Sequence, residues 1–321
     1  MNPHISVAEA AKFLNITTQA VHHKIKKHNL VTQKIHNKVC FSHETARLVF
    51  EHSFSSPMIK AIQIVKGGTG KSTMSFHLAV RASLYGARVL CIDLDQQANL
   101  TSLFRVRSEN IHSMFNILND SQNVPLEKGI INIQPGIDLM PSNLENAALD
   151  DVLLVKGLPL ERIYKDLIET IKDSYDLILL DCPPALGRSV AAAAFASDEV
   201  IAPVIPEKLC LRGLELLHNS LDSLSKRKYA HRIPYRILFN RFNARTTLSK
   251  SILASLMNHP IFRDKTLSTY VRHSQEFPNV SAAGYSLFES SKLSPAKEDI
   301  DALTQEILFP NLLKNTKNNH A

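Results

Sequence analysis

The chain has 321 residues, of which 44% are hydrophobic, and a formal net charge of +7. This length allows more than one domain and a large buried core. Charges or prolines interrupt the apolar runs well before the roughly 18 residues that a membrane span needs, and no basic-then-apolar signal peptide opens the chain. The four cysteines are far apart in the sequence, which is typical of reduced, buried thiols. We therefore expect a cytoplasmic protein with neither a disulfide framework nor a membrane anchor.

The charge is unevenly distributed along the chain. Residues 1–60 have a net charge of +5, residues 61–225 of −6, and residues 226–321 of +8. Two basic segments that flank an acidic one are the electrostatic pattern expected for contact with nucleic-acid phosphates. A basic surface that is merely solvated is the alternative for the C-terminal segment.

Residues 1–52 have the pattern of a small helical module. Ser6 and Glu9 form a capping box, in which the serine side chain and the glutamate satisfy the first free N–H groups of a helix. The expected elements are a helix from Ser6, a second helix from Thr17 or Thr18 to about His28, a wing hairpin over 36–41, and a third helix capped by Ser42 that runs through Phe50.

The second of these helices has one polar face, while Val21 and Ile25 point inward. The polar residues are Gln19, His22, His23 and Lys26. This pattern resembles the helix-turn-helix of MerR- and excisionase-like DNA-binding modules, and the resemblance implies that the polar face enters the major groove. A protein-docking helix pair remains an alternative. Seven histidines in residues 1–60 raise the question of zinc, but none has finger-like spacing with cysteines.

A glycine-rich loop follows a predicted linker over 53–57 and an apolar strand over 62–65. Its residues are Lys66, Gly67, Gly68, Thr69, Gly70, Lys71, Ser72 and Thr73. The glycines allow consecutive backbone N–H groups to approach phosphate oxygens, and the following helix favours anions at its start. Lys71 supplies a positive charge for the β- and γ-phosphates, and Ser72 supplies a hydroxyl for the metal. The segment predicts a nucleoside triphosphate site.

The loop departs from the general P-loop pattern, because Val65 stands where that pattern has glycine and a second lysine, Lys66, opens the loop. In this it resembles the deviant Walker A box of the ParA/MinD family of dimerising ATPases. The resemblance implies ATP and Mg²⁺ as cofactors and a doubly wound, mostly parallel α/β sheet over residues 58–310. It also implies an ATP-dependent homodimer in which Lys66 reaches the nucleotide of the partner.

Two further apolar strands end in acids, over residues 88–95 and 175–181. In an open α/β sheet such strand ends lie beside the phosphate loop. Both segments resemble family motifs, although Gln96 replaces the usual proline and Ala98 the usual glycine. The resemblance assigns the attacking water to Asp95. It assigns the Mg²⁺ site to Ser72, Asp93, Asp95 and Asp181, and the catalytic roles to Lys66, Lys71 and Asp95.

Downstream segments continue the resemblance more weakly. Pro206 falls in a strand-to-helix segment near the adenine, and Asn240 ends a strand where relatives read the base; a turn residue is the alternative for Asn240. The basic C-terminal part leads us to expect that Arg263, Lys265 and Arg272 contact DNA phosphates without sequence preference. Residues 311–321 are predicted to be a disordered tail.

Taken together, these resemblances imply a ParA-type partition ATPase. By resemblance, an ATP-bound dimer binds nonspecific DNA on the nucleoid, and a ParB-like partner stimulates slow hydrolysis, so that a plasmid or chromosome is positioned. The N-terminal module is expected to regulate its own operon. The alternatives are a transcriptional repressor switched by nucleotide and a MinD-like ATPase that positions a division site or other cargo.

Overall fold

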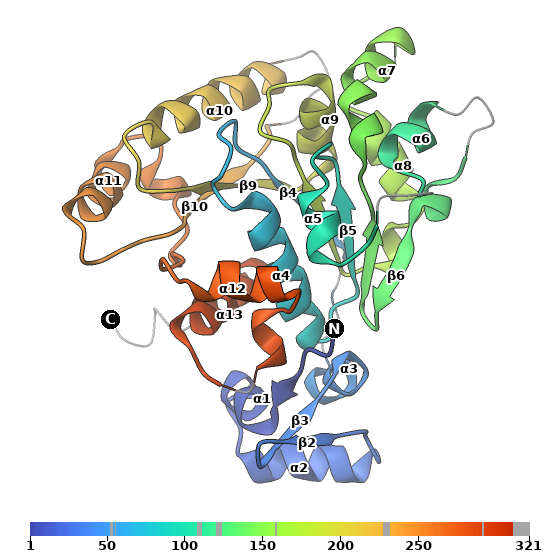
Figure 1. Cartoon of the computed structure of the whole chain (residues 1–321), viewed down its shortest axis with the longest axis vertical. Coiled ribbons are helices and arrows are strands. Elements are labelled where there is room, and N and C mark those ends of the chain that lie inside the picture. Colours follow the sequence, from blue (N-terminus) through green and yellow to red (C-terminus); the bar gives the residue numbers. More distant parts are fainter. Residues whose placement is uncertain are drawn as a thin grey trace.

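The computed structural model describes residues 1–51, 54, 56–107, 111–119, 124–157, 159–226, 232–290 and 292–310. The expected linker over 53–57 is only partly included, and the expected tail over 311–321 lies outside the described residues. A twisted sheet with helices on both faces forms most of the molecule, and residues 1–51 form a small module at one end (Figure 1). Among the described residues, no helix is long and apolar enough to cross a membrane.

The main sheet has seven strands in the order β10-β9-β4-β8-β5-β7-β6. Its strands are β4 (Met58–Ile62), β5 (Val89–Asp93), β6 (Ile131–Gln134), β7 (Ile137–Met140), β8 (Leu177–Asp181), β9 (Glu199–Val204) and β10 (Tyr235–Phe239). Neighbouring strands are parallel except for the edge pair β6–β7. The mostly parallel α/β sheet expected from the sequence is therefore confirmed. Near-continuous apolar strands fit this arrangement, because both faces of such a sheet are covered.

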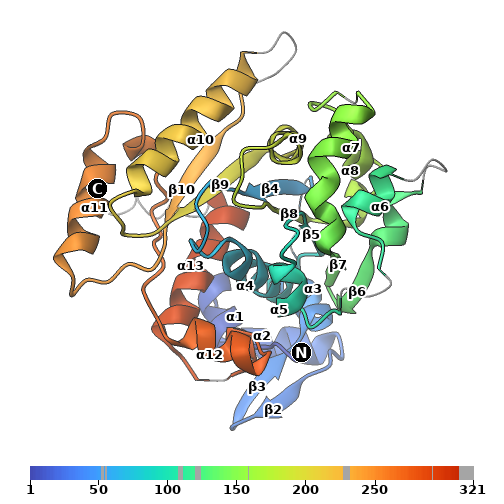
Figure 2. The same cartoon turned by 45° about the horizontal axis from the view of Figure 1, so that its top comes forward.

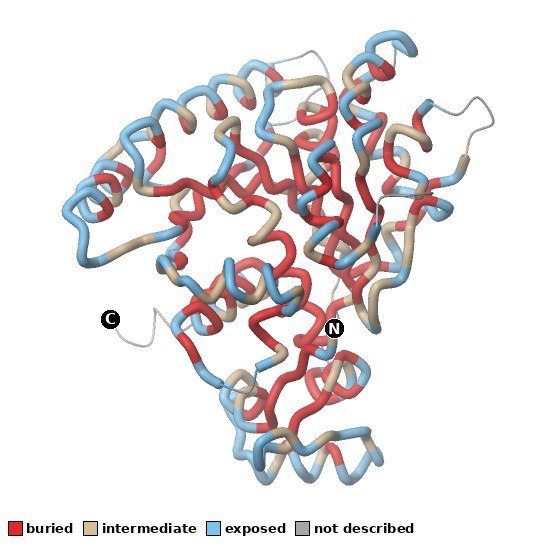
Figure 3. The backbone as a smooth tube through the Cα atoms, viewed as in Figure 1, coloured by how far each residue is buried: buried red, intermediate tan, exposed pale blue. Residues whose placement is uncertain are grey.

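Alternate residues of the strands belong to two different cores. In β8, Ile178 and Leu180 belong to one core, whereas Leu177 and Leu179 belong to the other. The first core includes α6 (Met114–Asn119), α7 (Leu149–Val155), α8 (Ile163–Glu169), α9 (Arg188–Ala196), α10 (Cys210–Ser225) and α11 (Thr247–Asn258). The second includes α4 (Lys71–Leu84), α5 (Asn99–Leu103), α12 (Glu276–Ala283) and α13 (Pro295–Leu308). The buried strands run through the centre of the molecule in Figure 3.

The N-terminal module contains three helices and a small antiparallel sheet in the order β1-β3-β2. Its elements are β1 (Ile5–Ser6), α1 (Val7–Leu14), α2 (Thr18–Lys27), β2 (Gln33–Ile35), β3 (Lys38–Phe41) and α3 (His43–Phe50). The predicted capping box of Ser6 and Glu9 is confirmed, and Thr17 caps α2 by accepting the N–H of Ala20. Ser42 stands at the expected cap of α3 but makes no capping bond, because its hydroxyl donates to Glu44 instead.

The module packs directly on the large domain. Tyr85, at the end of α4, contacts Phe13 and Phe50 of the module at ring-centroid distances of 4.5 and 5.5 Å. Residues of α1 and α3 also belong to the same core as α4 and α13. Figure 2 shows α1 lying beside α13 and α4. The N-terminal module and the large domain therefore share a hydrophobic interface.

Candidate functional site

The glycine-rich loop joins β4 to α4 at the carboxyl edge of the sheet. Gly68 and Gly70 have φ angles of +73° and +91°, in the left-handed region where a side chain is strained. A Cβ on Gly70 would also lie only 2.6 Å from Nδ2 of Asn240. Helix α4 begins at Lys71, so the expected helix directly follows the glycines of the loop. A cavity of about 830 Å³ is lined by Gly67, Gly68, Gly70 and the first residues of α4.

Lys71 lies at the base of this cavity and is almost fully buried. Its Nζ atom is 3.4 Å from the carbonyl oxygen of Lys66. Burial lowers the pKa of Lys71, while the nearby carboxylates of Asp181 and Asp95 act in the opposite direction. A cation held in this way beside a glycine-rich loop is suited to bind phosphate oxygens.

Asp181 ends β8 directly beside the start of α4. Its Oδ1 atom accepts the hydroxyl of Ser75 at 2.9 Å, whereas its Oδ2 atom is buried with no hydrogen-bond partner in the described part of the chain. Burial raises the pKa of Asp181, and the nearby hydroxyls of Ser72 and Ser75 oppose this rise. An orphaned buried carboxylate oxygen is costly unless a cation completes it.

The donors at this point fit Mg²⁺. The described residues contain no group of three or more His, Cys, Asp or Glu side chains that would hold a metal by themselves. Mg²⁺ is commonly held by one or two carboxylates and a substrate phosphate, with water completing the octahedron. Asp181 Oδ2 and the Ser72 hydroxyl, next to the phosphate loop, are such a set.

The two acids at the end of β5 differ in their surroundings. Asp95 is among the residues that line the cavity, and its Oδ1 atom accepts the N–H of Gln97 at 3.0 Å. Asp93 is completely buried, and its two oxygens accept the N–H of Asp95 and both the N–H and the hydroxyl of Thr101. Burial and the charge of Asp181 raise the pKa of Asp93. Asp93 therefore organises its own loop, whereas Asp95 faces the cavity.

Lys66 is turned toward its own chain. Its ammonium group forms an ion pair with Glu207, which lies between β9 and α10. Pro206, the preceding residue, is half-buried and is not among the residues that line the cavity. In this conformation Lys66 is held at the rim of the site rather than over the phosphate loop.

Asn240 lies against the phosphate loop. Its Nδ2 atom donates to the carbonyl oxygen of Thr69 at 2.8 Å, and its Oδ1 atom accepts the N–H of Arg241 at 2.8 Å. These contacts brace the loop and use one of the two amide N–H groups of Asn240, which also lines the cavity, so its contact with a base stays a prediction.

Part of the cavity wall was not predicted from the sequence. Phe277, Pro278 and Ser281 of α12 line it opposite the loop, together with His273 and Ser274. Pro278 lies in the first turn of α12, where its missing N–H costs little. No local motif marks these residues, because only the packing of α12 brings them to the site.

The proposed DNA-contacting residues of α2 are all on its surface. Gln19, His22, His23 and Lys26 are exposed, and Val21 and Ile25 are buried as predicted. His22 also lines a groove of about 880 Å³ between the module and α13. The helix therefore presents Gln19, His23 and Lys26 outward and His22 toward the large domain.

The three C-terminal basic residues have different surroundings. Arg263 is exposed with its Nε atom 3.1 Å from Asp264, and Lys265 lies over the ring of Tyr235 at 4.7 Å. Arg272 is clamped by Asp299 at 2.7 Å and by Glu298 at 3.2 Å. In this conformation Arg272 is paired with two carboxylates, whereas Arg263 is exposed and Lys265 is half-buried, and the contact of all three with DNA phosphates stays a prediction.

Known proteins resemble this chain over the large domain. A family model described as an AAA domain matches residues 58–233. The cell division protein PomZ of Myxococcus xanthus is 30% identical over 246 residues, which cover 76% of this chain and 75% of PomZ. The sporulation initiation inhibitor protein Soj of Bacillus subtilis is 31% identical over 214 residues, which cover 66% of this chain and 83% of Soj.

A similar fold has been solved with a nucleotide analogue. The structure of a Borrelia burgdorferi protein assigned to plasmid partition, bound to AMPPNP, superposes with a TM-score of 0.64 at 25% identity. The match covers 81% of this chain and 99% of that protein.

Proposed function

Because this chain belongs to the ParA/MinD-type family of P-loop ATPases, which includes Soj and PomZ, we propose that it is a ParA-type positioning ATPase that segregates a plasmid or chromosome. The observation that carries the proposal is the phosphate loop with two lysines, Lys66 and Lys71, beside the inward-facing acids Asp95 and Asp181. We expect the protein to act in the cytoplasm, in association with the nucleoid.

The site is suited to hydrolysis of ATP. The loop from Gly67 to Thr73 would bind the phosphates, with Lys71 on the β- and γ-oxygens and Asn240 bracing the loop from behind. Ser72 and Asp181 would hold Mg²⁺, which neutralises charge on the phosphates when bound. Asp95 would orient the attacking water, and Asp93 supports it through the loop. Pro206 remains our candidate for an adenine contact.

Dimerisation would release Lys66 from Glu207. Phosphoryl transfer depends on positioning and charge neutralisation, so a lysine supplied by a second subunit acts like an arginine finger. The ion pair with Glu207 in the single chain supports this proposal. It holds the ammonium group of Lys66 away from the bound phosphates until the phosphate of a partner subunit's nucleotide competes for it.

Three variants test this chemistry. Asp95→Ala should form a long-lived ATP-bound dimer that hydrolyses poorly, because only water positioning is lost. Lys66→Ala should bind ATP as a monomer and fail to turn over. Lys226→Ala, a surface lysine with a local ion pair to Asp222, is the matched control. Light scattering and phosphate release measure both steps, and a Lys66→Ala protein with normal dimerisation and turnover would contradict the role of Lys66.

We also propose two DNA-binding surfaces. Gln19, His22, His23 and Lys26 of the winged helix-turn-helix would read an operator, with Gln19 as the best base reader because its amide can pair with adenine. Arg263 and Lys265 would contact DNA phosphates without sequence preference. A ParB-like partner would stimulate hydrolysis and release the dimer from DNA. The basic charge of both segments supports these proposals.

Point variants in the full chain test the two surfaces separately. Deleting the module is unsuitable, because the deletion would expose the apolar core that it shares with α4 and α13. Gln19→Ala should abolish footprinting on the upstream region of the gene and leave binding to random DNA unchanged. Neutralising Arg263 and Lys265 should flatten the salt dependence of nonspecific binding by about 0.9 log–log units per lost contact. Unchanged footprints from Gln19→Ala would leave the module as a docking element.

A nucleotide-switched repressor is the second candidate. The same helix, α4, begins at the phosphate loop and ends against the N-terminal module, so nucleotide binding and operator binding meet on one element. If operator affinity changes with ATP but no ATP-dependent dimer moves on random DNA, this role holds without partition. Because the relative PomZ is described as a cell division protein, positioning of a division site is a further candidate function.

A further inference from the structure

A buried chain of hydrogen bonds leads from the segment after β7 to the backbone of Asp95. The hydroxyl of Ser142 donates to the carbonyl oxygen of Asp95 at 2.6 Å. Nδ2 of Asn146 donates to the Ser142 hydroxyl at 2.7 Å and lies 3.3 Å from the carbonyl oxygen of Asp93. Both side chains are buried.

The same chain also reaches the carboxylate of Asp93. The N–H of Ser142 donates to the hydroxyl of Thr101 at 2.9 Å, and that hydroxyl donates to Asp93. The Oδ1 atom of Asn146 accepts the N–H of Phe115, so the amide is fixed at both ends. A buried polar network in which each member is satisfied rigidifies the backbone that it holds.

The loop that carries Asp95 needs such a support. It lacks the proline and the glycine of the related motif, since Gln96 and Ala98 stand in their places. Ala98 has a φ angle of +51°, in the left-handed region that costs energy for a residue with a Cβ. A strained loop persists only where its surroundings over-determine it. The hydroxyl of Ser142 holds the turn from Asp95 to Ala98 by donating to the carbonyl oxygen of Asp95, the first residue of that turn.

We propose that Ser142 and Asn146 are positioning residues for Asp95, which hold its backbone so that its carboxylate stays directed into the nucleotide cavity. The proposal rests on the proposed ATP hydrolysis, because Ser142 and Asn146 would affect the rate of hydrolysis by positioning Asp95. Neither side chain is among the residues that line the cavity, so neither acts on the nucleotide directly. Loss of the Ser142 hydroxyl should therefore lower turnover and leave nucleotide affinity unchanged.

The test compares Ser142→Ala with a neighbouring control, Asn143→Ala. The side chain of Asn143 caps the N–H of Glu145 on the same segment but makes no contact with Asp95. Steady-state phosphate release, fluorescent-nucleotide affinity and peptide-level hydrogen exchange are measured on the full chain. Ser142→Ala should lower kcat at least tenfold and speed exchange over residues 93–101, because a displacement of about 1 Å can cost up to 100-fold in rate. The Kd for nucleotide should change less than threefold.

The conservative variant Ser142→Cys keeps the volume and a weak donor, so it should fall between the wild type and Ser142→Ala. It also carries the test if Ser142→Ala does not fold. An unchanged kcat, an equal loss in Asn143→Ala, or a fall in kcat with an equal loss of nucleotide affinity would overturn the positioning role. A wild-type protein that binds ATP without hydrolysing it would overturn the proposed function as well, which distinguishes the two failures.

Discussion

The two ends of α4 both bury a basic side chain, but they treat it differently. At the first end, Lys71 lies near Asp181, and one oxygen of that carboxylate has no hydrogen-bond partner among the described residues. At the last end, Arg81 contacts Asp301 at 2.6 Å and Glu9 at 4.0 Å. We call the first end, at Lys71, the open end, because its polar groups can still bind phosphate and metal. We call the last end, at Arg81, the closed end, because its charged group is paired with carboxylates of the protein itself.

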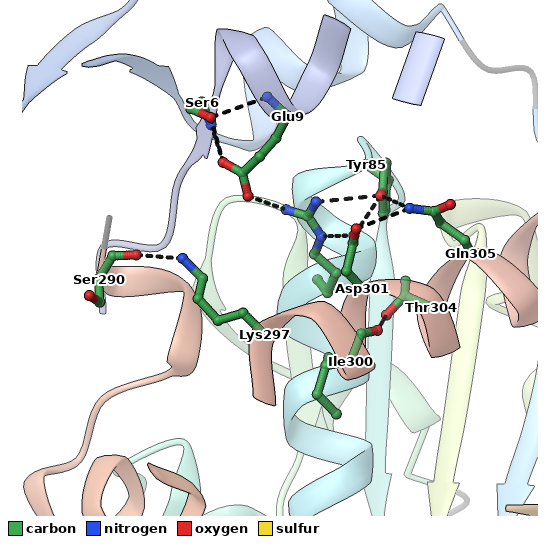
Figure 4. A network of polar contacts seen from close by, with 10 residues as sticks. Ser6, Glu9, Tyr85, Ser290, Lys297, Ile300, Asp301, Thr304 and Gln305 are labelled. Atoms are coloured by element: carbon green, nitrogen blue, oxygen red, sulfur yellow. Dashed lines mark hydrogen bonds and ion pairs between the residues drawn. The ribbon is translucent and has the colours of Figure 1, made fainter. Parts of the chain in front are cut away.

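The network at the last end joins three parts of the chain. Glu9 belongs to α1, Arg81 to α4 and Tyr85 to its C-cap, and Asp301 and Gln305 belong to α13. The hydroxyl of Tyr85 donates to Asp301 at 2.6 Å and accepts Nε2 of Gln305 at 2.8 Å, as Figure 4 shows. Within the described residues Nη1 of Arg81 also makes no hydrogen bond, but it faces the Glu9 carboxylate at 4.0 Å, so the charges of this cluster are balanced inside the protein. The cluster is therefore a joint between three elements, whereas the end at Lys71 can accept a ligand.

The largest effect expected is at the open end. Lys71→Ala should lower nucleotide affinity about 100-fold or more, because charge-assisted hydrogen bonds contribute about 1.5–3 kcal/mol each. The unfolding free energy should change less, since the hydrogen bond from Lys71 to the Lys66 carbonyl is long, at 3.4 Å, and the nearby carboxylates of Asp181 and Asp95 offset the cost of burying its charge only in part. Fluorescent-nucleotide titration and urea unfolding measure the two quantities. Retained affinity with lost stability would reverse the contrast between the two ends.

The closed end should respond in the opposite sense. Arg81→Met should lower the free energy of unfolding by about 2–3 kcal/mol, somewhat less than for a fully buried pair, because Asp301 and Glu9 are partly exposed. Nucleotide affinity should stay within threefold of the wild type. Lys226→Met breaks an exposed ion pair with Asp222 and should cost less than about 0.5 kcal/mol. If folded Arg81→Met protein cannot bind nucleotide, the two ends are coupled.

A pH series isolates the contribution of the module to this joint. Burial by itself would raise the pKa of Glu9, but Arg81 and the hydroxyl and N–H of Ser6 lower it below its usual value. Lys297 and His4 are the other titratable groups close to it. Because the folded pKa is lowered, the stabilisation is complete above the ordinary value of 4.5 and is lost as the pH falls through the folded pKa.

Glu9→Gln should therefore be about 1 kcal/mol less stable than the wild type at pH 7, and the difference should disappear in acid. Urea unfolding from pH 7 to pH 3 measures this difference. A gap that is constant with pH would show that Glu9 acts through its hydrogen bonds to Ser6 and not through its charge.

The smallest effect concerns strain at the open end. Ala98→Gly removes a left-handed Cβ that costs about 1–2 kcal/mol, while the added chain entropy of glycine offsets about 0.4–1 kcal/mol. We expect a net stabilisation below about 1 kcal/mol. Ala191→Gly, inside α9, should instead destabilise by about 1 kcal/mol. Thermal unfolding of both variants checks the sign, and a destabilised Ala98→Gly would show that the turn is not strained.

The sequence by itself determined the elements that depend on local chemistry. Glycines that adopt positive φ and a lysine at a helix start specified the phosphate loop, and α4 begins where that pattern placed it. The capping box of Ser6 and Glu9 likewise specified the start of α1. Near-continuous apolar runs predicted buried strands, and the family resemblance added that the sheet is mostly parallel.

The tertiary structure decided which side chains face the site. Asp93 and Asp95 are two residues apart, yet only Asp95 lines the cavity, because Thr101 and the backbone turn enclose Asp93. Asn240 contacts the phosphate loop, which its place at a strand end does not reveal, and residues of α12 line the same cavity. Contacts between residues far apart in the chain depend on how whole elements pack. Local propensity therefore specifies where an element begins, whereas packing specifies what its side chains meet.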